Sequence, residues 1–308
     1  MTVDLEARIA ALPCWRGKVT LEPLHGGLSN TAFVVDDGRE RYVARCGVDI
    51  PVHHVSRERE RAASVAAHAL GLSPELVYSE PGVIVIRHID GRTFAEADMR
   101  TNIERIIPLL TTCHRELARG LEGSASMFWV FHIIRDYART LRAARGDDDG
   151  ELARFVAVAN ALEAKQLPLP VAFGHHDLLP GNFIDDGTRL WVIDWEYGGF
   201  GTAMFDLANL ATNGNFSPDE DRFLLEAYFR EPVSDGMQRS FDAMKVASAL
   251  REAMWAMVSE IHLATPGADY RAHAAEYLHR TESALSRYAA RHGNLRCAGL
   301  AALRREGK

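Results

Sequence analysis

Three side chains with oxygen donors stand at spacings that suit phosphoryl transfer. Asp177 is followed by Asn182 five residues later and by Asp194 17 residues later. In such reactions one carboxylate accepts a hydroxyl proton, while an amide oxygen and a second carboxylate hold Mg²⁺ against the nucleotide phosphates. The three residue types at these offsets are the ligand set that a phosphoryl-transfer site needs.

Short apolar runs around these residues predict the elements that position them. Residues 183–184 and 190–193 are apolar and are separated by a turn signal at 185–188, which predicts a small hairpin. Pro180-Gly181 fixes a loop before its first strand. The hairpin brings Asn182 and Asp194 to the same end, where a hard cation that keeps several waters would find oxygen ligands.

These residues allow two other interpretations. Each Asx side chain alone is more often a turn residue, although the joint spacing between apolar strands favours the functional interpretation. His175-His176-Asp177 could instead be zinc ligands, but no His or Cys partner stands at ligand spacing. His175 is therefore expected to brace the loop by hydrogen bonds. The four cysteines are scattered along the chain, at Cys14, Cys46, Cys113 and Cys297.

His175, Asp177, Asn182 and Asp194 together resemble the catalytic signature of the aminoglycoside phosphotransferase and choline kinase superfamily, which has a two-lobed protein-kinase-like fold. Residues 194–197 and 205–209 further resemble its choline/ethanolamine kinase branch. The resemblance runs from about residue 20 to about residue 290 and is strongest over 174–209. It implies that Asp177 is the catalytic base, that Asn182 and Asp194 bind Mg²⁺, and that ATP is the phosphate donor.

The N-terminal third resembles the nucleotide side of such a site. A glycine-rich segment between two apolar runs suits a loop whose backbone N–H groups approach phosphates, although Gly-Gly alone fits a plain hairpin turn better. The residues expected to contact the nucleotide there are Gly26, Gly27, Ser29 and Asn30.

Arg45 ends the next apolar strand, at a position where the family often has Lys. Because Arg is a permanent bidentate phosphate binder, the resemblance implies that it contacts phosphate. The helix expected over 55–70 offers Glu60 as its ion-pair partner, while Glu58 and Glu60 could equally be solvated surface charges. The apolar strand 83–86 leads to Arg87, His88 and Ile89, the hinge whose backbone would meet the adenine.

Length and composition set the frame for this fold. The 308 residues, 47% hydrophobic and 25% charged, suffice for two lobes of ordinary globular composition. We predict an α+β protein with an N-terminal nucleotide-binding lobe over 1–90 and a C-terminal catalytic and substrate-binding lobe over 91–308. Apolar residues at helical spacing predict further helices over 103–117, 131–144, 152–164, 223–229, 241–261 and 270–288.

The net charge and the cysteine pattern restrict the partners and the compartment. A net charge of −7 argues against nucleic acid and is compatible with a cationic substrate. No apolar run reaches the length of a membrane span, and scattered cysteines without a signal peptide predict a reduced, cytoplasmic compartment. The sequence does not indicate an oligomeric state.

The acceptor pocket is expected beside Asp177. Choline-type acceptors carry a cation that aromatic faces and a carboxylate hold best. The candidate walls are Trp195, Tyr197, Trp255 and Tyr277, each of which could instead be a core aromatic. Asn213 stands where choline kinases often have a Glu near the ammonium, and Glu196 or Glu252 could replace that carboxylate.

These features predict an ATP- and Mg²⁺-dependent kinase whose acceptor is a small, cationic alcohol, with choline or ethanolamine favoured. An aminoglycoside or thiamine kinase is the alternative enzyme. A nucleotide-binding pseudokinase that serves as an interaction module is the alternative from another class, and the intact set of Asp177, Asn182 and Asp194 argues against it.

Overall fold

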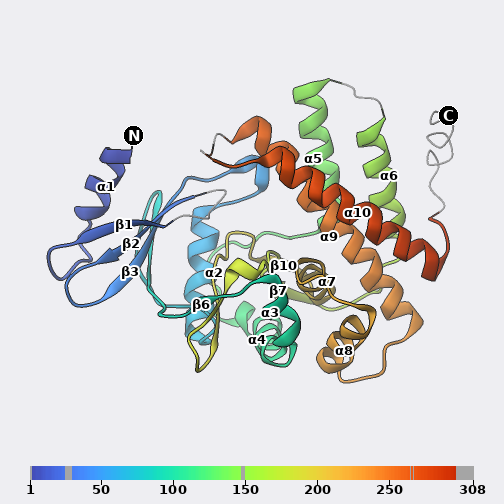
Figure 1. Cartoon of the computed structure of the whole chain (residues 1–308), viewed down its shortest axis with the longest axis horizontal. Helices are drawn as coiled ribbons and strands as arrows, with labels where there is room; N and C mark the ends of the chain where they lie inside the picture. Colours follow the sequence, from blue (N-terminus) through green and yellow to red (C-terminus); the bar gives the residue numbers. More distant parts are fainter. Residues whose placement is uncertain (1, 25–29, 147–149, 264, 266, 296–308) are drawn as a thin grey trace.

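A β-rich N-terminal lobe and a mainly helical C-terminal lobe make up the molecule (Figure 1). The structure is a computed structural model, and it describes residues 2–24, 30–146, 150–263, 265 and 267–295. The two-lobed α+β architecture predicted from the sequence is confirmed. The expected phosphate-contacting residues Gly26, Gly27 and Ser29 lie outside the described residues.

The N-terminal lobe is built on a five-stranded antiparallel sheet in the order β1-β2-β3-β5-β4. Its strands are β1 (Thr20–Leu24), β2 (Thr31–Asp36), β3 (Arg41–Cys46), β4 (Leu76–Glu80) and β5 (Val83–Arg87). Burial alternates along β3, as expected where successive side chains point to opposite faces. Tyr42, Ala44 and Cys46 join the lobe's own core, so that Val43 and Arg45 point to the other face and line a cleft.

Two helices flank this sheet. Helix α1 (Thr2–Ala10), which the sequence analysis did not predict, contributes Ile9 to the core on the far side of the sheet. Helix α2 (Arg57–Ala69) matches the helix expected over 55–70. Its small side chains, among them Ala63 and Ala67, belong to the large core of the C-terminal lobe. Helix α2 therefore couples the two lobes and holds Glu60 on its buried face.

The C-terminal lobe carries two small sheets among its helices. The sheets pair β6 (Arg92–Thr93) with β8 (Phe183–Asp185) and β9 (Leu190–Val192), and β7 (Val171–Gly174) with β10 (Gly199–Thr202). The α-helices are α3 (Glu96–Thr101), α4 (Ile103–Glu116), α5 (Val130–Arg145), α6 (Glu151–Glu163), α7 (Ala203–Asn213), α8 (Pro218–Phe229), α9 (Asp235–His262) and α10 (Tyr270–His292). Single 3₁₀ turns are η1 (Pro51–His53), η2 (Leu117–Arg119) and η3 (Pro180–Asn182).

Two helices begin earlier than apolar spacing alone predicts. Helix α8 starts at Pro218 and not near residue 223, because Ser217 caps it and exchanges hydrogen bonds with Glu220 in a capping box. Helix α9 starts at Asp235, after the N-cap Ser234. The first turn of α8 contains the polar Asp219 and Glu220, and that of α9 contains Asp235 and Gln238, so hydrophobic periodicity alone does not reveal where these helices begin.

Helix α9 is the axis of the C-terminal lobe. Its 28 residues are surrounded by α5, α7 and α10, and residues on all its sides are buried. Figure 1 shows α10 lying along α9. This helix carries Arg251 and Trp255 to the cleft, and its Ser248 accepts a hydrogen bond from Asn209 of α7.

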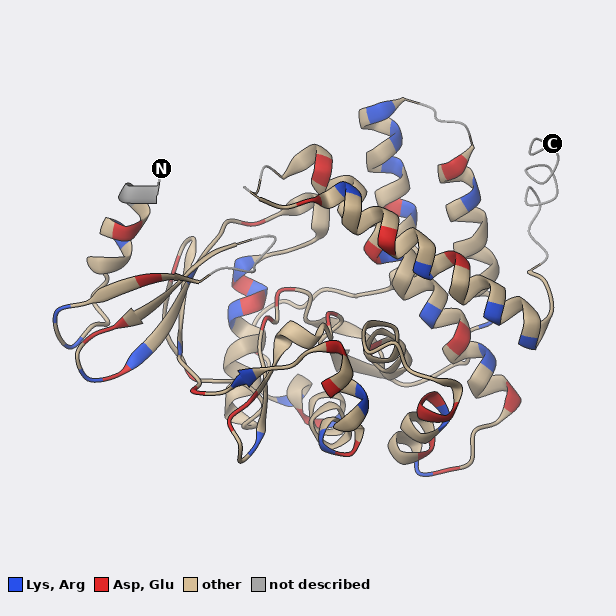
Figure 2. Ribbon diagram, viewed as in Figure 1, with Lys and Arg blue, Asp and Glu red and all other residues tan. Residues whose placement is uncertain are grey.

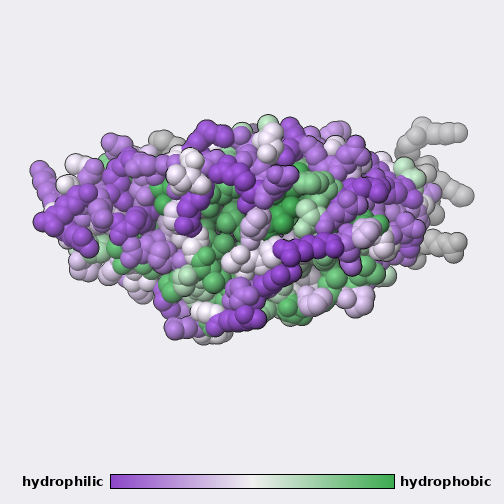
Figure 3. Space-filling model, turned by 90° about the horizontal axis from the view of Figure 1, so that it is seen from below, coloured by the Kyte–Doolittle hydropathy of each residue, from purple (hydrophilic) through white to green (hydrophobic). Residues whose placement is uncertain are grey.

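The surface mixes both signs of charge. Helix α10 carries acidic and basic residues side by side (Figure 2). Seen from below, hydrophobic residues gather near the middle of the molecule, with hydrophilic residues on either side (Figure 3). None of the helices in the described ranges is both long enough and apolar enough to cross a membrane.

A buried ion pair joins α8 to α9, and its removal should destabilise the fold. Lys245 Nζ lies 2.8 and 2.7 Å from the two carboxylate oxygens of Asp221. Burial raises the pKa of Asp221 to about 6, although the Lys245 ammonium acts against this. Lys245→Met should lower the free energy of unfolding by about 3–5 kcal/mol, because it leaves a buried carboxylate without a partner. Urea denaturation would measure this loss.

The pH dependence and a double variant test the physical cause. Without Lys245 the pKa of Asp221 rises further, so the loss should be larger at pH 8, where the buried carboxyl is charged, than at pH 5. Lys245→Met combined with Asp221→Leu should recover most of the stability. A loss that is equal at both pH values, and that the double variant does not relieve, would show that charge burial is not the cause.

Candidate active site

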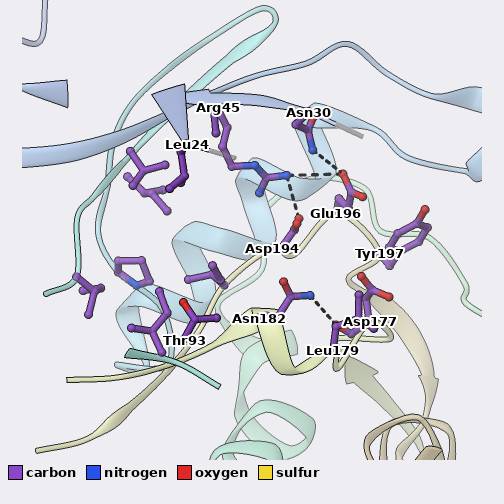
Figure 4. Close-up of a pocket in the computed structure, with 18 of the residues that line it drawn as sticks. Leu24, Asn30, Arg45, Thr93, Asp177, Leu179, Asn182, Asp194, Glu196 and Tyr197 are labelled. Atoms are coloured by element: carbon purple, nitrogen blue, oxygen red, sulfur yellow. Dashed lines mark hydrogen bonds and ion pairs between the residues drawn. The ribbon is translucent and has the colours of Figure 1, made fainter. Parts of the chain in front are cut away.

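A cleft of about 670 Å³ is lined by residues of both lobes and brings together Asp177, Asn182 and Asp194. The predicted hairpin is present as β8 and β9, and Ile193 N donates to Asn182 O at 3.0 Å. Asn182 Nδ2 donates to Asp177 O at 2.8 Å, and Figure 4 shows the Asn182 amide oxygen turned toward Asp194. The structure therefore places the three residues on one wall, as the spacing predicted.

Helix α7 holds the loop that carries Asp177 from behind. The backbone N–H groups of His175 and His176 both donate to Asp206 at 2.8 Å. Leu178 N donates to Asn209 Oδ1 at 2.6 Å. Both acceptors come from the first two turns of α7 and are buried. The segment 205–209, which carries part of the family resemblance, thus fixes the backbone of this loop.

His175 braces the same loop, as expected. Its Nε2 lies 2.9 Å from Ile193 O, and its Nδ1 accepts from Asp177 N at 3.3 Å. Burial lowers the pKa of His175, which favours the neutral ring that this donor and acceptor pattern needs. Among the described residues no group of three His, Cys, Asp or Glu side chains is placed to hold a metal ion, so nothing supports the zinc alternative there.

Arg251 of α9 faces Asp177 across the cleft floor. Its Nη1 lies 3.5 Å from Asp177 Oδ1, and its side chain is buried. Burial raises the pKa of Asp177 well above its usual range, and the Arg251 charge acts against that rise. The guanidinium favours the ionised carboxylate that a base must be. Arg251 is not among the residues predicted from the sequence, although a charged pair inside the apolar stretch 246–258 is a signal that could have revealed it.

The predicted ion pair between Arg45 and Glu60 is present. Arg45 Nη1 lies 2.9 Å from Glu60 Oε1, and Arg45 Nη2 lies 2.9 Å from Asp194 Oδ1. Glu60 is buried, whereas Glu58 is exposed. The alternative in which both are solvated therefore applies to Glu58 alone. The pair aims Arg45 at the cleft, beside the predicted metal ligand.

Glu196 connects the cleft to the N-terminal lobe. Its Oε2 lies 2.8 Å from Arg57 Nη1 and accepts from Asn30 Nδ2 at 3.3 Å. Figure 4 shows it beside Asn30 and the guanidinium of Arg45. Glu196 lines the cleft, and its described contacts are with the N-terminal lobe; that it contacts the acceptor stays a prediction. The structure also places Asn30 in the cleft wall.

The expected hinge residues also line the cleft. Arg87 is the last residue of β5, His88 and Ile89 follow it, and all three border the cleft beside β3. The Arg87 side chain lies 2.7 Å from carboxylates of Glu40 and Glu75. His88 N donates to Arg41 O at 3.0 Å. That the hinge backbone meets the adenine stays a prediction.

Of the four expected aromatic walls, Tyr197 and Trp255 border the cleft. Trp255 Nε1 donates to Tyr197 Oη at 2.8 Å, so each ring fixes the other. Trp195 is a correction: it is buried against His175, with ring centroids 4.7 Å apart, and does not line the cleft. Trp195 begins a tight turn over residues 195–198, in which Gly198 N donates to Trp195 O, and its side chain is directed into the core.

Asn213 and Tyr277 are also corrections. Tyr277 Oη donates to Asn213 Oδ1 at 3.2 Å, and Asn213 Nδ2 donates to Leu178 O at 3.1 Å. Both side chains are buried behind the catalytic loop and do not line the cleft. They support the loop backbone. An uncharged amide suits residue 213 because its nitrogen can donate to Leu178 O while its oxygen accepts from Tyr277.

The donors around Asp194 fit a magnesium ion. Asp194 Oδ1 is buried and accepts no hydrogen bond, although the Arg45 guanidinium lies beside it. A carboxylate oxygen in this state, with the Asn182 amide oxygen turned toward it, is a donor set that suits a hard cation. Asp194 has a left-handed backbone, with φ of 67°, which turns its carboxylate into the cleft.

Comparison with known proteins gives the relatives of this chain. Residues 20–240 match the family described as phosphotransferase enzymes. The choline/ethanolamine kinase family protein of Mesorhizobium loti is 28% identical, with a TM-score of 0.74, and the alignment covers 95% of this chain and 99% of that one. Choline kinase LicA of Streptococcus pneumoniae is 23% identical, with a TM-score of 0.74 over 94% of this chain and 99% of that one, a likeness of fold.

A sequence relative agrees with this result. LicA of Haemophilus influenzae is 24% identical over 207 residues, which cover 66% of this chain and 61% of LicA. The chain thus spans less than two thirds of that relative's length. The resemblance inferred from the motif is confirmed, because the family match extends over most of the chain and includes Asp177, Asn182 and Asp194. The chain belongs to the phosphotransferase enzyme family.

Proposed function

We propose that this protein is an ATP- and Mg²⁺-dependent phosphotransferase that acts on the hydroxyl of a small amino alcohol, such as choline or ethanolamine. The observation that carries the proposal is the convergence of Asp177, Asn182 and Asp194 in one cleft, with Arg45 beside them. The kinship with choline/ethanolamine kinase family proteins supports the same acceptor class.

Each residue has a definable part in this proposal. Asp177 orients the acceptor hydroxyl and takes its proton, while the Arg251 charge favours the ionised form of that carboxylate against the effect of burial. Asn182 and Asp194 would hold Mg²⁺, which supplies positive charge against the phosphate oxygens when bound. Arg45, anchored by Glu60, offers a second, permanent positive charge to the nucleotide. Transfer is then a matter of positioning and charge neutralisation, as is general for this reaction.

The experiment that tests the proposal is acceptor-dependent release of ADP. Purified protein with MgATP would be offered choline, ethanolamine, thiamine and an aminoglycoside such as kanamycin, with Asp177→Asn protein as the background. The expected result is turnover with at least one amino alcohol. Turnover with thiamine or the aminoglycoside alone would leave a phosphotransferase but remove the amino-alcohol assignment. Nucleotide binding without turnover on any acceptor would favour the pseudokinase alternative.

A further inference from the structure

The acceptor end of the cleft contains a carboxylate that is already oriented. Glu252 of α9 borders the cleft and is 7% exposed. Its Oε2 lies 2.6 Å from Arg251 Nη1, and its Oε1 lies 2.9 Å from His273 Nε2. Burial acts to raise the pKa of Glu252, but the hydrogen bond from His273 and the Arg251 charge outweigh it and lower the pKa. Glu252 is therefore a fixed, charged acceptor of hydrogen bonds.

The same end offers little free aromatic surface. Among the described residues that line the cleft, only Tyr197 and Trp255 are Tyr, Trp or Phe. The guanidinium carbon of Arg251 lies 4.5 Å from the centroid of the Tyr197 ring, so a cation already covers that face. Trp255 lies against His53, with centroids 5.3 Å apart and planes inclined by 33°. An aromatic cage for a methylated cation needs several open faces, and these two rings do not supply them.

The charges of Asp177, Glu252 and Arg251 can be balanced by one bound cationic group. Arg251 Nη1 lies between Asp177 Oδ1 at 3.5 Å and Glu252 Oε2 at 2.6 Å. One guanidinium thus stands between two carboxylates, and the set has one negative charge in excess when both are ionised. Because Arg251 Nη1 lies near both carboxylates, the two are close to each other. A two-carbon amino alcohol could therefore place its hydroxyl at Asp177 and its ammonium at Glu252. A buried charge of this kind is stabilised by a bound counter-ion.

We propose that Glu252, oriented by His273, accepts an N–H hydrogen bond from the acceptor's ammonium group and thereby selects primary, secondary and tertiary amino alcohols over quaternary ones. This inference rests on the proposed function and narrows its substrate class. A carboxylate has about four lone-pair positions, and Arg251 and His273 use two of them, which leaves positions for an N–H donor. A trimethylammonium group cannot donate and would hold water away from the carboxylate without replacing its hydrogen bonds.

The decisive experiment measures kcat and KM for ethanolamine, N-methylethanolamine, N,N-dimethylethanolamine and choline. The charge is the same along this series, while the number of N–H donors falls from three to none. A lost hydrogen bond to a charged group corresponds to roughly 10- to 100-fold in kcat/KM. We expect the largest step between the dimethyl compound and choline, and we expect it mainly in KM, because the ammonium lies away from the transferred phosphate.

Two variants and a matched control connect the selectivity to these residues. Glu252→Gln keeps the shape but removes the charge and should flatten the series. His273→Phe removes the hydrogen bond to Glu252 from a partly exposed position and should flatten it in part. Glu260→Gln makes the same chemical change on α9 at a residue that pairs with Arg271 and does not line the cleft, so the series should be unchanged.

The outcomes separate this inference from the proposed function. If choline is used as well as ethanolamine, or better, the selection by Glu252 is overturned while the amino-alcohol kinase stands. If neither is used, both proposals fail together. If Glu252→Gln does not fold, the series on the wild-type protein and on His273→Phe still decides the matter, since a flat series in the wild type is sufficient to reject the inference.

Discussion

Replacing Asp177 by asparagine should lower kcat by about 10²–10⁴-fold. Asparagine keeps the size of the side chain but can neither accept the hydroxyl proton nor balance the Arg251 charge. Asp177 contributes to the cleft floor and the loop is held from behind by Asp206 and Asn209, so the backbone should stay in place. Nucleotide affinity, measured by titration calorimetry, should change little, because the loss concerns the reacting hydroxyl.

A carboxylate on the hairpin that follows the Asp177 loop provides the control for this result. Asp185 of β8 pairs with Arg105 and does not line the cleft, so Asp185→Asn should keep near-normal turnover. Near-normal turnover in folded Asp177→Asn protein would mean that the base lies elsewhere. Circular dichroism and the unfolding midpoint would establish that both variants are folded.

Replacing Asp194 by asparagine should abolish measurable turnover and remove the magnesium dependence of nucleotide binding. Because φ at Asp194 is 67°, asparagine is the suitable replacement: it tolerates the left-handed region, whereas alanine would add about 1–2 kcal/mol of backbone strain. The amide retains one oxygen but loses the charge that a hard cation prefers. Arg45 would at the same time lose one of its ionic partners.

Calorimetric titration of ATP with and without Mg²⁺ separates binding from chemistry. In the wild-type protein magnesium should tighten nucleotide binding, and in Asp194→Asn this difference should largely disappear. Asp186→Asn, at the exposed turn of the hairpin, serves as the matched variant, since Asp186 bonds only residues of that turn and strand among its described contacts. An unchanged magnesium effect in Asp194→Asn would remove Asp194 from the metal site.

The parts of the site that the sequence predicted are those built by local signals. The turn at 185–188 between two apolar runs is enough to place Asn182 and Asp194 at one end of a hairpin, and the structure has that hairpin. The pair between Arg45 and Glu60 was chosen through a resemblance, and burial of Glu60 but not of Glu58 is its physical basis. Both predictions needed only short stretches of chain.

The site residues that the sequence did not predict depend on which side chains of a buried helix point into the cleft. Helix α9 is buried on all sides, so apolar periodicity cannot show which of its residues reach the cleft. Arg251 was overlooked for that reason. The prediction that Tyr277 and Trp195 line the pocket is wrong, because aromatic residues suit a core equally well and only tertiary packing distinguishes the two places.

The hydrogen bonds from Asp206 and Asn209 have a consequence for hydrogen exchange. The amide protons of His175, His176 and Leu178 point at buried acceptors, although these residues lie in irregular chain. They should exchange with deuterium as slowly as the amides of α7, far more slowly than Arg189, whose amide bonds the exposed Asp186. Exchange at these three amides would then require helix α7 and the loop to separate. The loop that carries Asp177 would then be among the slowest segments of the protein to open. The motions that admit substrates and release products would belong to other parts of the chain.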